Sequence, residues 1–254
     1  MNTNTSPFKV IFMSFKKRQK SLVSFLLIFL IGAVSAFSEE FEEHRFKNVI
    51  AAFEKDRVEN QLPEEAVLCV GSSSMRMWDS RIKDDLYPLT VISRGFGGSQ
   101  FSDVLYFFDE LIIRYKPRAI LIYEGDNDLS GGLTPGAVFE DFKEFQGRVH
   151  EFDPEIRIYV IGVKPSVVRW NLKDQIEETN RLLAAECDAN PTLTYIDVSK
   201  FLLDDSGSPR EGIFLDDGLH LNTVGYNLWA AAVGLQLIPA EIEFEDLVTQ
   251  DLPE

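Results

Sequence analysis

The sequence predicts an α/β fold, in which a parallel sheet is covered by helices on both faces. Two observations lead to this prediction. Five short apolar segments have the length of buried strands, and segments with apolar residues at helical spacing separate them. Strands that alternate with helices in this way form parallel sheets. No repeat, low-complexity stretch or glycine-rich linker divides the 254 residues, which indicates one main domain.

A helix is expected before the first strand. Residues 38–40 combine a serine with two glutamates, which is typical of a helix start. Apolar residues then recur at helical spacing between 46 and 53. This helix should run to about Asn60 and pack on the main domain as an extension.

The first strand has the clearest pattern. Residues 66–70 are five apolar residues in a row and end at Gly71, as expected of a strand buried on both faces. The remaining strands are expected at 90–93, 119–123, 156–161 and 193–197. The helices that follow them are expected at about 102–115, 135–152, 172–190 and 223–235.

Charge argues against one class of partner. The formal net charge is −16, and so acidic a chain repels phosphates. No nucleic acid partner is therefore expected. The one basic cluster, 16–20, precedes an apolar run at 22–34 and the small residues 35–36. That order is typical of a secretory signal peptide. It predicts a secreted or periplasmic protein, with an uncleaved membrane anchor as the alternative.

These features divide the chain into four parts. We expect a signal peptide at 1–36, a helical extension at 37–63, the main domain at 64–236 and an acidic C-terminal tail at 237–254. The two cysteines, Cys69 and Cys187, do not suggest a disulfide framework. No histidine and cysteine cluster implies a metal. No cofactor and no stable protein partner is expected.

A candidate nucleophile follows the first strand. Three serines, 72–74, stand at its carboxyl end, where ligands bind in open α/β sheets. A serine nucleophile needs a histidine base and a carboxylate that orients it. His220 has Asp217 three residues ahead of it, which can fold back onto the ring. His44 and His150 are expected at the surface. Taken singly, each polar residue could equally be a turn or cap residue.

Two loops offer donors for an oxyanion. Residues 94–99 form a glycine-rich loop after the second strand, and residues 124–128 follow the third. The N–H of Gly98 can approach a ligand closely because glycine has no Cβ. Asn127 offers a side-chain NH2. If the strands are parallel, both loops lie on the same rim as the serines.

Taken together, these segments resemble the SGNH (GDSL-like) hydrolase superfamily of lipases and esterases. Four short blocks occur in the order that the superfamily has, and the resemblance covers about residues 64–236. The blocks are Gly71-Ser72-Ser73, Gly95-Phe96-Gly97-Gly98, Gly125-Asp126-Asn127-Asp128 and Asp217-Gly218-Leu219-His220. The resemblance implies a three-layer α/β/α sandwich, flavodoxin-like, with a five-stranded, mostly parallel sheet.

The resemblance also implies a role for each site residue. Ser73 would be the nucleophile and, through its N–H, the first oxyanion donor. Gly98 and Asn127 would be the other donors, His220 the base and Asp217 its orienting carboxylate. The superfamily usually has Asp before the nucleophile, whereas Ser72 stands here. If the register is shifted, Ser72 or Ser74 is the alternative nucleophile.

The expected activity is hydrolysis of an acyl ester through an acyl-enzyme. The substrate would be a small-molecule, carbohydrate or lipid ester. Two alternatives remain, an O-acyltransferase on the same residues and a secreted carbohydrate-binding module with an inactive site. Four side chains are candidate pocket residues, with core or rim positions as the other interpretation: Arg76, Trp78, Arg94 and Trp170.

Overall fold

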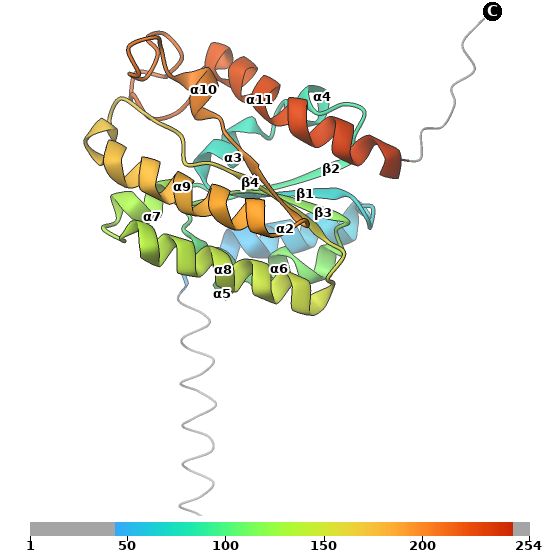
Figure 1. Ribbon diagram of the computed structural model, residues 1–254. Helices are drawn as coiled ribbons and strands as arrows, with labels where there is room; N and C mark the ends of the chain where they lie inside the picture. Colours follow the sequence, from blue (N-terminus) through green and yellow to red (C-terminus); the bar gives the residue numbers. More distant parts are fainter. Residues whose placement is uncertain (1–43, 246–254) are drawn as a thin grey trace, which may run out of the picture. The chain divides into compact units, whose positions relative to one another are not determined.

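A computed structural model describes residues 44–245 of the chain (Figure 1). The chain divides into two compact units, 1–48 and 49–254, and the account below concerns the second. The predicted signal peptide and the helix start at 38–40 lie outside the described residues. Among the helices of residues 44–245, none is long and apolar enough to span a membrane.

Five strands form one sheet, and every neighbouring pair is parallel. The strands are β1 (Val67–Gly71), β2 (Val91–Gly95), β3 (Ala119–Tyr123), β4 (Arg157–Ile161) and β5 (Leu193–Ile196). They lie in the order β2-β1-β3-β4-β5. The predicted α/β fold with a parallel sheet is therefore confirmed, and the strand positions agree with the sequence pattern to within two residues.

Helices cover both faces of the sheet. Figure 1 shows α3, α4, α10 and α11 on one side and α5, α6, α8 and α9 on the other. The helices of the described chain are α2 (Lys47–Glu59), α3 (Ser73–Trp78), α4 (Ile82–Asp85), α5 (Phe101–Tyr106), α6 (Phe108–Leu111), α7 (Asp126–Ser130), α8 (Pro135–Phe152), α9 (Lys173–Ala189), α10 (Ser199–Leu202) and α11 (Thr223–Glu241).

Aromatic side chains form the core on each face. On the α11 side, the ring of Trp229 packs edge-on against Trp78 and Tyr123, with centroids 6.3 and 5.0 Å away. On the α8 side, Phe101 contacts Phe142 and Phe145 at centroid distances of 6.1 and 6.4 Å. All of these pairs except Phe101–Phe145 are edge-to-face, a geometry that adds to the free energy gained by burial. The rigid sheet between these two layers holds the loops at its rims in place.

The predicted helix at 102–115 is broken in the structure. It consists of α5, α6 and a 3₁₀ turn at Ile113–Tyr115. Phe107 lies between the two helices with ψ at 27°, outside the helical range. Phe107 and Phe108 are both only 2% exposed. The break lets these adjacent rings both enter the core, which a pattern of one buried helical face does not anticipate.

The C-terminal boundary at 236 is wrong, because α11 continues through Pro239 to Glu241. The Glu241 side chain is fully buried and accepts hydrogen bonds from Arg157 Nε at 2.6 Å and Tyr159 Oη at 2.7 Å. Arg118 also binds this carboxylate, at 3.1 Å. Residues 237–245 therefore belong to the main domain, and 246–254 lie outside the described part.

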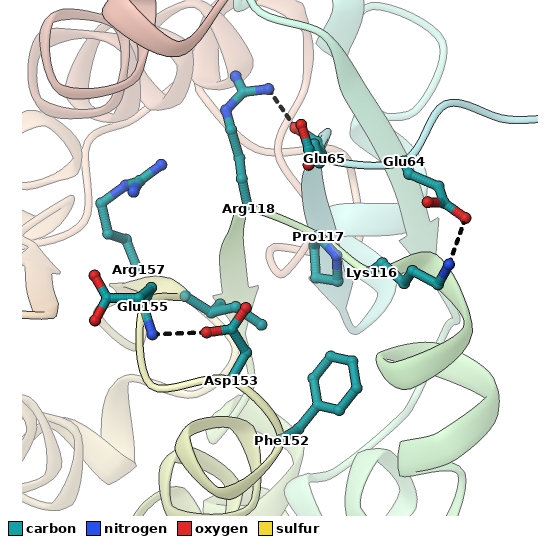
Figure 2. Close-up of a pocket in the computed structure, with 10 residues that line it drawn as sticks. Glu64, Glu65, Lys116, Pro117, Arg118, Phe152, Asp153, Glu155 and Arg157 are labelled. Carbon is teal, nitrogen blue, oxygen red and sulfur yellow. Dashed lines mark hydrogen bonds and ion pairs between the residues drawn. The ribbon is translucent and has the colours of Figure 1, made fainter.

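A cavity of about 360 Å³ lies beside this cluster, at the amino ends of β3 and β4. In Figure 2, dashed lines join Lys116 to Glu64 and Arg118 to Glu65 at the wall of this cavity. Lys116 Nζ lies 2.8 Å from Glu64, and Arg118 donates to the Glu65 carbonyl oxygen at 2.5 Å (Figure 2). The cations that line the cavity are thus already paired, which is typical of a structural network.

Candidate active site

The carboxyl ends of the central strands are level with one another. Gly71, the last residue of β1, pairs with Gly95 of β2 and with Tyr123 of β3. The chain leaves β1 toward β2 on one side and later returns to β3 on the other. Ligands bind at such a switch point in open α/β sheets. Gly71 has φ of +149°, and a Cβ there would lie 2.2 Å from the Tyr123 carbonyl oxygen. Only glycine fits this turn.

Ser73 is the serine that faces a histidine. It is the first residue of α3, directly after the turn at Gly71. Its Oγ lies 2.9 Å from His220 Nε2. Ser72 and Ser74 are only 1% and 2% exposed, whereas Ser73 is half-buried. Of the three serines, the structure therefore brings Ser73 to the histidine.

The other ring nitrogen of His220 binds Asp217. Nδ1 lies 2.6 Å from Asp217 Oδ2, while Oδ1 accepts the backbone N–H groups of Leu219 and His220 at 2.9 Å each. The hydrogen bonds from the His220 ring and from these two N–H groups lower the pKa of Asp217 to about 2. The carboxylate is ionised and can only accept, so Nδ1 donates. In the neutral ring Nε2 is then an acceptor for the Ser73 hydroxyl proton.

Backbone bonds hold the loop that carries this pair. The N–H of Leu215 donates to the His220 carbonyl oxygen at 2.8 Å, which closes the loop on itself. Asn222 caps α11 by accepting the N–H groups of Val224 and Gly225. The N–H of Val168 donates to the Gly218 carbonyl oxygen at 3.1 Å. His220 is therefore held from its own loop, from α11 and from the loop after β4.

The two predicted oxyanion donors lie next to each other. Asn127 is in the first turn of α7, and its Nδ2 donates to the Ser99 carbonyl oxygen at 2.9 Å, one residue after Gly98. The N–H of Phe96 donates to the Gly71 carbonyl oxygen at 2.8 Å, which ties the glycine loop to the end of β1. Within the described residues, a Cβ on Gly98 would meet nothing within 4 Å, but φ is +86°. Backbone conformation, rather than close approach, is what calls for glycine there.

The sequence pattern assigned no role to three charged residues that lie at or beside Asn127. Arg169 Nη2 donates to Asn127 Oδ1 at 3.0 Å, and its Nη1 to Asp126 Oδ1 at 2.5 Å. Lys164 Nζ, with a fully buried side chain, lies 2.9 Å from Asp126 Oδ2. The available signal was their position, because both bases follow the fourth strand and so reach the same rim as Asp126.

A second buried acid lies behind the glycine loop. Glu124, 1% exposed, accepts the Ser99 hydroxyl at 2.5 Å through Oε1, while its Oε2 has no partner within the described chain. Burial and the nearby Asp128 carboxylate hold the pKa of Glu124 well above its usual range. Burial therefore favours the protonated form of Glu124.

The four candidate pocket residues divide into two pairs. Trp78 and Arg94 are buried; the Trp78 ring packs in the core, and Arg94 binds Asp56 at 2.6 Å and the Tyr115 hydroxyl at 2.7 Å. Neither lines the site. Arg76 is exposed and lies beside Gly97, and Trp170 is half-buried next to Arg169. His150 is distant from the site and binds the Ile156 carbonyl oxygen at 3.2 Å.

The model of the GDSL-like Lipase/Acylhydrolase family matches residues 66–228, which include every residue of the site. The chain belongs to this family. Its members are GDSL/SGNH acylhydrolases and esterases, so the resemblance seen in the sequence is confirmed. No curated protein matches the chain in sequence.

Solved structures share the GDSL-like fold. A GDSL-like lipase from Bacteroides thetaiotaomicron VPI-5482 has 20% identity and a TM-score of 0.62, over 75% of this chain and 99% of that one. A family 3 carbohydrate esterase from Clostridium thermocellum has 14% identity and a TM-score of 0.60, over 72% and 99%. A lipase/acylhydrolase from Enterococcus faecalis has 20% identity and a TM-score of 0.55, over 68% and 96%. Identities this low establish the fold and no substrate.

Proposed function

We propose that this chain is a serine esterase that cleaves acyl esters through an acyl-enzyme on Ser73. The observation that carries the proposal is the continuous line of hydrogen bonds from Ser73 Oγ through the His220 ring to Asp217, at 2.9 and 2.6 Å. These are the distances that a base and its nucleophile need for proton transfer.

In the first half-reaction, Ser73 Oγ attacks the carbonyl carbon of the ester while His220 Nε2 takes the hydroxyl proton. The carbonyl oxygen becomes an oxyanion, which the N–H groups of Ser73 and Gly98 and the side-chain amide of Asn127 would stabilise. When the intermediate collapses, the bond to the alcohol breaks, and the alcohol leaves with the proton from His220.

In the second half-reaction, water replaces the alcohol. His220 takes a proton from the water as the water oxygen attacks the acyl carbon. The bond to Ser73 Oγ then breaks, and Oγ regains the proton from His220. Asp217 stays ionised throughout and stabilises the imidazolium that forms in each step.

An apolar rim beside the histidine loop supports an acyl ester as the substrate. Val167, Val168 and Leu215 are 57%, 56% and 42% exposed, and Val167 lies against Gly218 in that loop. Exposed apolar side chains next to a catalytic group favour an apolar part of the ligand. We expect the acyl chain to contact this rim.

A panel of substrates tests the proposal. The wild type and Ser73→Ala would be assayed on 4-nitrophenyl esters of graded acyl length and on acetylated sugars. Turnover that requires Ser73 supports the esterase, and a rise in kcat/KM with acyl length supports contact with the rim. If no ester in the panel is turned over, the esterase proposal fails.

We also propose that the protein is exported. The support is the order of the basic cluster 16–20, the apolar run 22–34 and the small residues 35–36. Mass spectrometry of the exported protein should find a mature amino terminus near Phe37 or Glu39. Retention of residues 22–34 in a membrane fraction would instead favour the anchor.

A further inference from the structure

The Asn127 carboxamide is held at both of its ends. Nδ2 donates to the Ser99 carbonyl oxygen at 2.9 Å, and Oδ1 accepts from Arg169 Nη2 at 3.0 Å. In the flipped orientation, the NH2 group would face the guanidinium donors and Oδ1 would face another carbonyl oxygen. The two contacts therefore allow one orientation only. They use one of the two amide protons, which leaves the other N–H for a ligand.

The arginine that holds Asn127 is itself held. Arg169 Nη1 donates to Asp126 Oδ1 at 2.5 Å, and Asp126 Oδ2 accepts from Lys164 Nζ at 2.9 Å. The Lys164 side chain is fully buried, and those of Asp126 and Arg169 are 6% and 15% exposed. Burial alone would raise the pKa of Asp126, but the two cations outweigh burial and lower it. Asp126 is thus ionised, and the three charges sum to one positive charge beside Asn127.

We propose that Arg169 is a positioning residue of the oxyanion hole, which orients and polarises the Asn127 carboxamide so that its remaining N–H meets the developing negative charge. This inference rests on the serine esterase proposed above. It adds a residue outside the triad and outside the three oxyanion donors. Arg169 acts through Asn127, and Asp126 and Lys164 fix the guanidinium that does so.

The planar guanidinium is essential to this role. Arg169 presents two N–H groups in a fixed fork, one to Asp126 and one to Asn127. A lysine would keep the positive charge for Asp126 but has one rotating ammonium in place of the fork. Arg169→Lys should therefore preserve the fold and recover only part of the activity. Arg169→Ala still leaves Asp126 paired with Lys164, so its carboxylate is not left without a cation.

The experiment measures two rates on the same variants. The first is the labelling of Ser73 by an alkyl fluorophosphonate, followed by intact mass. In that reaction the Oγ–P bond forms, the P–F bond breaks, fluoride leaves and His220 takes the hydroxyl proton. The second is kcat and KM on the best ester of the panel. Labelling needs the oxyanion hole but does not depend on knowing the natural substrate.

A double-mutant comparison with Asn127→Ala provides the decisive result. In the wild-type background, Arg169→Ala should lower the labelling rate and kcat at least tenfold. The loss should not exceed the roughly 10²–10³ that removal of a whole oxyanion donor costs. KM should change little. In the Asn127→Ala background, Arg169→Ala should cost no more than about twofold, because Arg169 then has nothing to position.

Controls distinguish a failure of the positioning role of Arg169 from a failure of the esterase proposal. Arg181→Ala removes an exposed arginine of α9 that pairs with Glu178, and it should leave both rates unchanged. Equal losses from Arg169→Ala in both backgrounds, or a loss entirely in KM, would overturn the positioning role while leaving the esterase intact. Thermal melts and Arg169→Lys guard against misfolding. If wild-type Ser73 is not labelled at all, the esterase proposal falls, and the positioning role falls with it.

Discussion

Ser73 Oγ and His220 Nε2 lie 2.9 Å apart, although the two residues are 147 positions apart in the chain. The bond joins the turn after β1 to the loop before α11. Because both atoms handle the same proton in the proposed mechanism, the two residues should act as one unit. That expectation can be measured directly.

Ser73→Ala should abolish nearly all turnover, and adding His220→Ala should cost little more. Residues of one covalent mechanism are strongly non-additive, since loss of the nucleophile leaves the base nothing to activate. Steady-state assays of the two single variants and the double variant would check this. Activity in Ser73→Ala together with a dead Ser72→Ala or Ser74→Ala would show that the nucleophile is misassigned.

Asn127→Ala should still form the acyl-enzyme but lose roughly 10²–10³ in kcat, with KM little changed. The lost N–H would act on charge that develops only in the transition state. Burst kinetics on a 4-nitrophenyl ester would separate acylation from the later step. A loss confined to KM would instead mean that Asn127 binds the ground state.

Asp217→Asn should keep the fold and lose up to about 10⁴ in kcat, because the amide can impose the wrong histidine tautomer. In the wild type, the pKa of Asp217 is lowered to about 2, so Asp217 stays ionised at every pH above about 4. The acid limb of the kcat/KM profile should then follow one ionisation. A slope of two in log(kcat/KM) against pH, above pH 4, would contradict the assignment of Asp217 as a permanently charged partner.

Glu124→Gln should gain stability relative to the wild type as pH rises. Burial and Asp128 raise the pKa of Glu124, so the native state keeps a proton that the unfolded state releases above the ordinary glutamate pKa of 4.5. Wild-type stability therefore falls with rising pH on account of this group. Glutamine keeps an acceptor for Ser99 and does not titrate. Urea unfolding at pH 5 and pH 9 should show that the free energy of unfolding of Glu124→Gln, relative to that of the wild type, is higher at pH 9. The same difference at both pH values would refute this prediction.

Glu241→Ala should lower the free energy of unfolding by about 1–3 kcal/mol, because Arg157 and Tyr159 lose the fully buried carboxylate that accepts their hydrogen bonds. The side chain is fully buried against Arg118, Arg157 and Tyr159 at the rim opposite the site. Below its melting temperature the variant should keep the wild-type kcat/KM. Glu243→Ala, at an exposed position two residues on, is the matched control and should be neutral. An equal loss of unfolding free energy in Glu241→Ala and Glu243→Ala would contradict a stabilising role for the buried Glu241 carboxylate.

Some of the fold could be predicted because the signals are local. Apolar runs such as 66–70 and helical spacing in 135–152 depend on neighbouring residues only, and the strands and α8 lie where these patterns indicate. Two predictions failed where packing overrides local pattern. The break at Phe107 depends on which rings the core admits, and the continuation of α11 past Pro239 accompanies the burial of Glu241.

The sequence by itself determined the fold class, the order of the elements and the segments that carry Ser73, Asn127 and His220, because periodicity and motif order are written along the chain. Only the tertiary structure decided the strand order, which serine faces the histidine and that Arg169 reaches Asn127. Those facts depend on register and on side chains far apart in sequence. The packed sheet carries both loops and so sets the 3.0 Å distance between Arg169 Nη2 and Asn127 Oδ1.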